Sequence, residues 1–110
     1  MEKLTSIEEF TKLINSTEKP IYIFKHSTRC PISAHAFQSF KEFISHHSDI
    51  ISAYVDVIHE RDVSNQIANS SKVTHQSPQV IIFQKAQPVW HASHYSISVE
   101  ALENQYKNLS

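Results

Sequence analysis

The chain has 110 residues, of which 40% are hydrophobic and 19% are charged, and its formal net charge is −1. This composition is typical of one ordinary globular domain, which we expect to span residues 1–110, and it excludes the basic surface that nucleic-acid binding requires. No apolar run approaches the ~20 residues of a membrane span, and the first residues lack the apolar core of a signal peptide, so we expect a cytoplasmic protein without a membrane partner.

Runs with the apolar spacing of helices alternate along the chain with short runs of β-forming residues. Helices are predicted over residues 6–15, 31–47 and 60–71, with a last helix capped by Ser96 or Ser98. Strands are predicted at 21–25, at 52–57, within 76–84, and at 88–92 as the second strand of a hairpin. The first helix has a clear start, because Ser6 and Glu9 form the S-x-x-E pattern of a capping box.

This order of elements, α-β-α-β-α-β-β-α, predicts the fold class. The first two helix–strand pairs imply parallel strands joined by right-handed crossovers, and the final hairpin adds antiparallel strands. We therefore predict an α/β protein with a four-stranded mixed sheet and helices on both faces, which is the thioredoxin-like plan.

The sequence contains no glycine. This absence excludes the glycine-rich loops that hold phosphates, so a nucleotide-binding role is not expected. It also affects the predicted hairpin, whose turn KAQ must be formed by Lys85 or Ala86 without the conformational freedom of glycine.

Cys30 is the single cysteine of the chain and lies directly before Pro31, in the stretch HSTRCPIS. Proline favours the first position of a helix, which makes Cys30 the predicted N-cap of the second helix. Its sulfur could then accept hydrogen bonds from the N–H groups of Ile32 or Ser33, at the positive end of the helix dipole. Both effects favour the thiolate, which is the nucleophilic form of cysteine.

Other side chains near Cys30 are predicted to support the thiolate. Arg29 would add a positive charge, His26 would add part of one, and the Ser33 hydroxyl would donate a hydrogen bond to the sulfur. The preceding strand would deliver Cys30 to the C-terminal edge of the sheet, where open α/β sheets bind ligands. A lone cysteine is often a small buried apolar residue, but the strand, polar loop, Cys-Pro pair and helix together favour a reactive thiol.

Ser33 occupies the position at which a C-x-x-C dithiol protein carries its second cysteine. Because exchange with a disulfide passes through a mixed disulfide, a second thiol must resolve it, and here that thiol has to come from outside the chain. A small thiol bound beside Cys30 is the simplest source. The arrangement suits the removal or transfer of a small-thiol adduct.

The chain contains eight histidines. Cys30 with His35, or His91 with His94, could be read as ligand pairs, but neither has a second Cys or His pair at zinc-finger spacing, so we expect no metal. Most are expected on the surface or in turns. His26 and His35 are the exceptions, because either could lie close enough to Cys30 to tune the thiolate.

Three stretches, KHSTRCPIS, SPQVIIF and PVWHASHYSI, together resemble the monothiol bacilliredoxins, over nearly the whole chain. The resemblance rests above all on the T-x-C-P-I-S core, which runs from Thr28 to Ser33. It implies that Cys30 takes bacillithiol from bacillithiolated client proteins, with bacillithiol as thiol co-substrate and no permanently bound cofactor. A second bacillithiol or another reductant would then regenerate Cys30. A monomer acting in redox homeostasis is the expectation.

The resemblance also implies where the substrate binds. Pro78, in QSPQ, occupies the place of the cis-proline that faces the active cysteine in thioredoxin relatives. The backbone of Ser77 and Gln79 beside it would pair with the peptide-like part of the bound thiol, and Thr28 would contact substrate from the cysteine loop.

Two other functions stay open. The chain could be an iron–sulfur-carrying protein like some monothiol glutaredoxins, although it lacks the glycine and phenylalanine that follow their cysteine. It could also be a non-enzymatic binding module with the thioredoxin fold, in which Cys30 has no role. Brown colour with a dimeric mass would indicate the first, and unchanged partner binding by Cys30→Ser would indicate the second.

Overall fold

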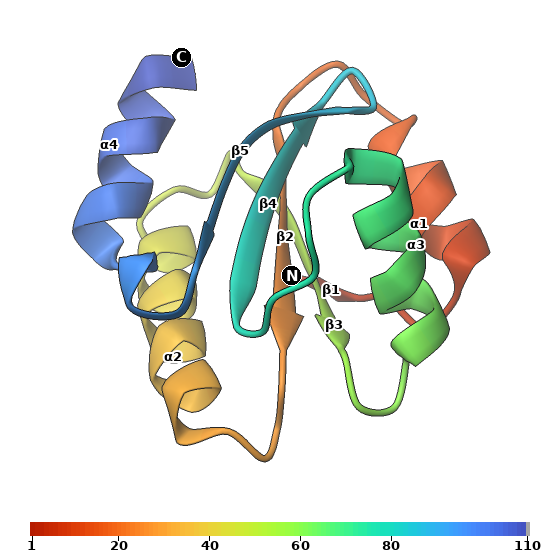
Figure 1. Ribbon diagram of the computed structural model, residues 1–110. Helices are drawn as coiled ribbons and strands as arrows, with labels where there is room; N and C mark the ends of the chain where they lie inside the picture. The colour runs from red at the N-terminus through yellow and green to blue at the C-terminus, as the bar shows by residue number, and fades with distance from the viewer. Residues whose placement is uncertain (110) are drawn as a thin grey trace.

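The computed structural model describes residues 1–109, and Figure 1 shows a central sheet with helices on both faces. Each predicted helix and strand is present, in the predicted order. The helices are α1 (Ile7–Ile14), α2 (Pro31–Ser45), α3 (Arg61–Ser71) and α4 (Val99–Leu109), with a short 3₁₀ turn η1 (His94–Ser96) before α4. The strands are β1 (Glu2–Lys3), β2 (Ile21–His26), β3 (Ile51–Asp56), β4 (Gln79–Gln84) and β5 (Gln87–Ser93).

The sheet has five strands in the order β1-β3-β2-β4-β5, with β2 in the centre. The strands β1, β3 and β2 are parallel, whereas β4 pairs antiparallel with both β2 and β5. The mixed sheet is confirmed, but the predicted number of four strands is one too low. The missed strand, β1, consists of two exposed polar residues, which carry no apolar pattern that sequence analysis could detect.

Two apolar cores lie on the two faces of the sheet. One core packs residues such as Ile21 and Ile23 of β2 against α1 and α3, and the other packs Tyr22 and Phe24 against α2 and α4. The alternation follows from the geometry of a strand, in which successive side chains point to opposite faces. Because both faces of β2 are covered, its sequence shows no polar alternation until Lys25.

Helix starts and the hairpin turn follow the local sequence. Ser6 caps α1 by accepting the Glu9 N–H at 3.1 Å, and Ser98, rather than Ser96, caps α4 by accepting the Ala101 N–H at 3.1 Å. Lys85 and Ala86 both adopt left-handed backbone conformations, with φ of 54° and 62°. Two residues with positive φ form the two-residue turn that matches the twist of a hairpin. Both Lys85 and Ala86, rather than one of them, therefore adopt the conformation that glycine usually takes.

Within residues 1–109, the longest helices fall short of the length and apolar character that a membrane-spanning segment needs.

Candidate active site

Three parts of the chain meet at one end of the sheet. Lys25 at the end of β2 pairs with Gln79 at the start of β4, and Gln79 pairs with Ser93 at the end of β5. The 27–30 loop, the Ser77–Pro78 peptide and η1 therefore all leave the sheet at this row. The backbone N–H of His94 donates to the Pro78 carbonyl at 3.0 Å, which ties η1 to the same edge.

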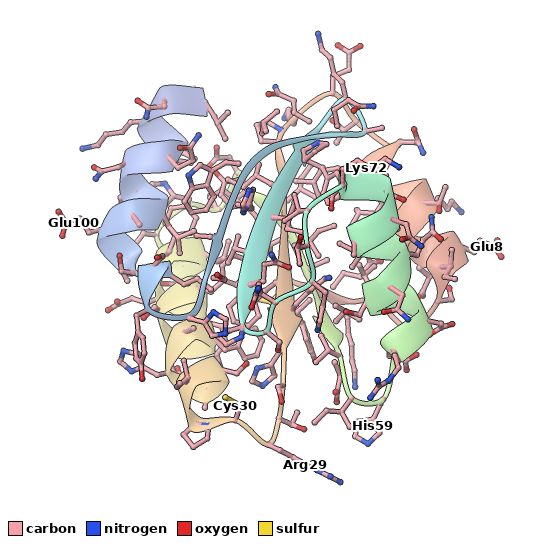
Figure 2. All side chains as sticks on the ribbon, viewed as in Figure 1. Glu8, Arg29, Cys30, His59, Lys72 and Glu100 are labelled. Carbon is pink, nitrogen blue, oxygen red and sulfur yellow. The ribbon has the colours of Figure 1, made fainter. Side chains whose placement is uncertain are left out.

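Cys30 lies at this edge as the N-cap residue of α2, with Pro31 in the first turn, as predicted. The backbone N–H of Ala34 donates to the Cys30 carbonyl at 3.0 Å, which is the first hydrogen bond of the helix. Among the described residues the sulfur makes no side-chain capping hydrogen bond, so the predicted bonds from Ile32 or Ser33 are not formed. Figure 2 shows the half-buried side chain at the lower end of α2, close to the polar loop.

Ser33 is fully buried, and its hydroxyl is used within the loop. It accepts the backbone N–H of Ser27 at 2.9 Å, and it lies 2.8 Å from Nδ1 of His26. Among the described residues, the hydroxyl contacts only these loop groups. The predicted hydrogen bond from Ser33 to the Cys30 sulfur is therefore not formed. Ser33 instead closes the turn that carries Cys30, whose N–H donates to the Ser27 carbonyl at 3.2 Å.

His26 packs against α2. Its ring stacks on Phe37 with a centroid distance of 4.4 Å. Burial lowers the pKa of His26 below its usual value, the Asp56 carboxylate opposes this change, and Lys41 adds to it. The lowered pKa opposes the predicted partial positive charge of His26 near Cys30, because burial disfavours the protonated ring.

The other predicted residues of the loop and of α2 are more exposed. Arg29 and Thr28 are exposed, and in Figure 2 the Arg29 side chain points away from the protein and from the Cys30 sulfur. Its charge therefore acts on the sulfur through solvent, which screens it. Ile32 is half-buried, and His35 has an exposed side chain on α2.

The Ser77–Pro78 peptide bond is cis, as the resemblance implied. Pro78 is buried, and Ser77 is half-buried with an Oγ that has no hydrogen-bond partner among the described residues. Gln79 lies inside β4, between Lys25 and Ser93, so its backbone belongs to the sheet ladder. Of the two backbones predicted to bind a thiol, only that of Ser77 lies outside the ladder.

A polar cluster that the sequence pattern did not predict lies beneath this edge. Lys25 is fully buried, and its Nζ lies 3.1 Å from Nδ1 of His75. Ser64 on α3 approaches the same nitrogen, with Oγ 3.2 Å away. The one available signal was the lysine that ends the apolar run IYIFK, although a strand commonly ends on a charged residue.

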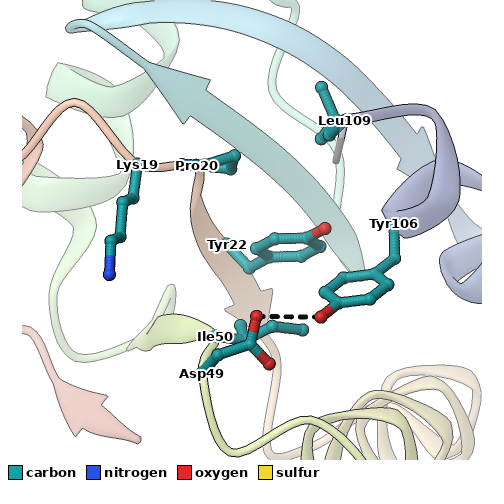
Figure 3. Close-up of a pocket in the computed structure, with 7 residues that line it drawn as sticks. All are labelled: Lys19, Pro20, Tyr22, Asp49, Ile50, Tyr106 and Leu109. Atoms are coloured by element: carbon teal, nitrogen blue, oxygen red, sulfur yellow. Dashed lines mark hydrogen bonds between the residues drawn. The ribbon is translucent and has the colours of Figure 1, made fainter.

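No group of three or more His, Cys, Asp or Glu residues within 1–109 could hold a metal ion. A cavity of about 200 Å³ lies at the other end of β2, between that strand and the end of α4 (Figure 3). There the Tyr106 hydroxyl donates to Oδ2 of Asp49 at 2.8 Å, and burial raises the pKa of Tyr22 to about 12. This cavity is separated from Cys30 by the length of the strand.

Comparisons with solved structures agree with this arrangement. A structure described as a candidate oxidoreductase with a thioredoxin fold is 36% identical to this chain, with a TM-score of 0.88, and the match covers 96% of this chain and 92% of that one. The thioredoxin of Fasciola hepatica has a TM-score of 0.82 at 16% identity over 100% of both chains. Mitochondrial thioredoxin 3 of Saccharomyces cerevisiae, in its oxidised form, has a TM-score of 0.80 at 22% identity, covering 99% of this chain and 95% of that one.

The two thioredoxins are too distant in sequence to show more than the fold, which is the predicted thioredoxin-like fold. The sequence pattern of one family, described as monothiol bacilliredoxin BrxC, matches residues 2–102. The chain therefore belongs to the monothiol bacilliredoxins, a family of thiol oxidoreductases with the thioredoxin fold.

Proposed function

We propose that this protein removes bacillithiol from mixed disulfides with client proteins, with Cys30 as the nucleophile. The observation that carries the proposal is the position of Cys30, at the start of α2 and at the same sheet edge as the Ser77–Pro78 peptide. The amino end of a helix favours a negatively charged group, and the thiolate is the reactive form of cysteine. Cys30 is also the single cysteine of the chain, so no internal disulfide can form.

The proposed reaction has two exchange steps. In the first, the Cys30 thiolate attacks the bacillithiol sulfur of the mixed disulfide, a new bond forms between these two sulfurs, and the client cysteine leaves as a thiolate. In the second, the thiolate of another bacillithiol attacks the adduct. It releases bacillithiol disulfide and restores Cys30, so the number of disulfide bonds is conserved in each step.

The remaining proposed site residues bind the substrate or shape the loop. The Ser77 backbone, which lies outside the sheet ladder, would pair with the peptide-like part of bacillithiol, beside Pro78. Thr28, exposed in the 27–30 loop, would contact the same ligand. Ser33 and His26 support Cys30 by fixing this loop rather than by bonding to the sulfur. We further propose that the protein acts as a monomer in the cytoplasm, where thiols are kept reduced.

Intact-mass spectrometry tests the proposal directly. Reduced protein is mixed with a client peptide that carries a bacillithiol mixed disulfide, and both species are weighed over time. We expect the free peptide thiol and a single bacillithiol adduct on the protein, and we expect added bacillithiol to remove this adduct. Cys30→Ser should form no adduct and release no peptide thiol.

A parallel reaction with a glutathione mixed disulfide measures the choice of small thiol. Faster exchange with the bacillithiol substrate supports the proposal, and equal rates contradict the assigned specificity. If wild-type protein forms no adduct and Cys30→Ser still binds its partners, the binding-module function replaces this one. A brown, dimeric sample whose colour requires Cys30 would instead indicate the iron–sulfur carrier.

A further inference from the structure

Lys25 is a buried cation without an acidic partner. Its side chain is fully buried on the face of β2 that carries Ile21 and Ile23, and no Asp or Glu among residues 1–109 forms an ion pair with it. Removing an ammonium from water without a counter-charge destabilises a fold, and an apolar residue of similar size would pack there at lower cost. The presence of lysine at this position therefore calls for a role other than stability.

The contact between Lys25 and His75 has a definite direction. An ammonium has donors and no acceptor, so the 3.1 Å contact requires Nδ1 of His75 to accept. The proton of the neutral ring is then on Nε2. Burial lowers the pKa of Lys25 to about 8, and the pKa of His75 is lowered by burial and then by the charges of Lys25 and Arg61. Both directions agree with an ammonium that donates to a neutral imidazole near neutral pH.

His75 belongs to residues 72–78, which join α3 to β4 and form neither a helix nor a strand. This 72–78 segment ends in the Ser77–Pro78 peptide, so its position determines where that peptide lies. Gln79, which is almost fully buried, also fixes the segment, because its Nε2 donates to the Thr74 carbonyl at 3.1 Å and its Oε1 accepts the Gln76 N–H at 3.3 Å.

Lys25 and Gln79 are directly opposite each other in the β2–β4 ladder. Opposite residues of an antiparallel pair point to the same face of the sheet. Two buried polar side chains of one row therefore hold the same irregular segment from the same side, at the point where β2 leads into the Cys30 loop. A segment without its own ladder needs such contacts to keep one conformation.

We propose that Lys25 is a positioning residue for the exchange reaction. Through His75 it fixes the 72–78 segment, and this keeps the Ser77–Pro78 peptide in one position at the sheet edge that carries Cys30. The inference rests on the proposed function, because it assigns the substrate-binding backbone to this segment. Lys25 itself does not touch the substrate or the reacting sulfur. It limits the free protein to few conformations of the segment, so less conformational entropy is lost when a mixed disulfide binds.

Lys25→Met, which keeps the length of the side chain and removes its donors, is the main test, and His75→Ala removes the acceptor. We expect each variant to increase hydrogen–deuterium exchange of the amides in the 72–78 segment roughly tenfold, as expected for the loss of one hydrogen bond to a charged group. We expect kcat/KM for the mixed disulfide to fall by a similar factor. The double variant should be no worse than either single variant, because both remove the same contact.

Two controls separate this role from general damage. His46→Ala, which removes an exposed histidine at the end of α2 far from the 72–78 segment, should behave as wild type. Alkylation of Cys30 by iodoacetamide, a small reagent that needs no docking, should keep its wild-type rate in Lys25→Met. Unchanged amide exchange in the 72–78 segment, additive effects of the two substitutions, or alkylation slowed in proportion to kcat/KM would each overturn the inference.

The test remains decisive if one variant does not fold or if the proposed function fails. His75 is far more exposed than Lys25, so His75→Ala provides the same comparison should Lys25→Met be unstable. If wild-type protein has no activity on the mixed disulfide, the proposed function fails. The amide-exchange comparison then shows separately whether Lys25 fixes the segment.

Discussion

Nδ1 of His26 lies 2.8 Å from Oγ of Ser33, and the same oxygen accepts the Ser27 N–H at 2.9 Å. The side chain that stands where a dithiol protein has its second cysteine is thus the residue that closes the Cys30 loop. The serine is fully buried, and its hydroxyl joins the end of β2 to the first turn of α2. Ser33 therefore holds the loop in place, and it also leaves this position without a resolving thiol.

Ser33→Ala should loosen this loop. The substitution leaves the Ser27 N–H and the His26 nitrogen without their shared partner, and such a loss costs about 1–2 kcal/mol. We expect the free energy of unfolding, measured by urea denaturation, to fall by this amount, with slower bacillithiol exchange. Ser39→Ala on the same helix is the matched control and should have little effect, because alanine is the better helix former. A Ser33→Ala variant as stable as the control would contradict this role.

Ser33→Cys should change the products of the reaction. A second thiol on the first turn of α2 can attack the adduct on Cys30, release bacillithiol and form an internal disulfide. We expect intact mass to show a transient adduct and then a protein about two daltons lighter than the reduced form, without added bacillithiol. Persistence of the adduct would mean that residue 33 cannot reach the Cys30 sulfur.

His26 should make the protein less stable in mild acid. Its pKa is lowered in the folded state, mainly by burial, so the unfolded chain binds the proton first as the pH falls below the ordinary value of 6.5. The free energy of unfolding therefore decreases on this side and is unaffected by His26 well above pH 6.5. His26→Phe, which keeps an aromatic ring against Phe37, should show a smaller decrease between pH 7 and pH 5 in urea titrations. An equal slope in both proteins would exclude His26 as the source.

Lys25→Met should raise global stability while it loosens the 72–78 segment. Burial lowers the pKa of Lys25 from 10.5 to about 8, so below pH 8 the folded state bears the full cost of the buried charge, about 1–3 kcal/mol. Between pH 8 and pH 10.5 the unfolded chain holds more protons, and wild-type stability rises with pH. The advantage of Lys25→Met in urea denaturation should thus be largest at pH 7 and shrink towards pH 10. A constant difference would contradict the lowered pKa.

The hairpin turn should accept glycine with a gain in stability. Lys85 and Ala86 both have positive φ, a conformation that costs roughly 1 kcal/mol or more for residues with a Cβ atom. The double substitution Lys85→Asn and Ala86→Gly supplies residues suited to this turn, and we expect Tm to rise by several degrees. Ala92→Gly in β5 is the opposite control and should lower Tm, because glycine weakens a strand.

The sequence by itself determined the elements, their order and the position of Cys30 at the start of α2. These features are local, because apolar spacing, capping residues and Cys-Pro act within a few residues of the chain. It also predicted Pro78 opposite the cysteine loop, through a resemblance that covers both segments. The short strand β1 escaped detection, since its two residues are held by pairing with β3 and not by a pattern of their own.

Only the tertiary structure decided how the polar side chains at the site are paired. Ser33 could have faced the sulfur or the loop, and Lys25 could have pointed into solvent at the end of its strand. Their partners lie on other elements, His75 being 50 residues away from Lys25 in the chain. A hydroxyl or an ammonium near the edge of a sheet has several side-chain conformations of similar energy. Burial between the sheet and the helices leaves only those conformations in which the group is hydrogen-bonded.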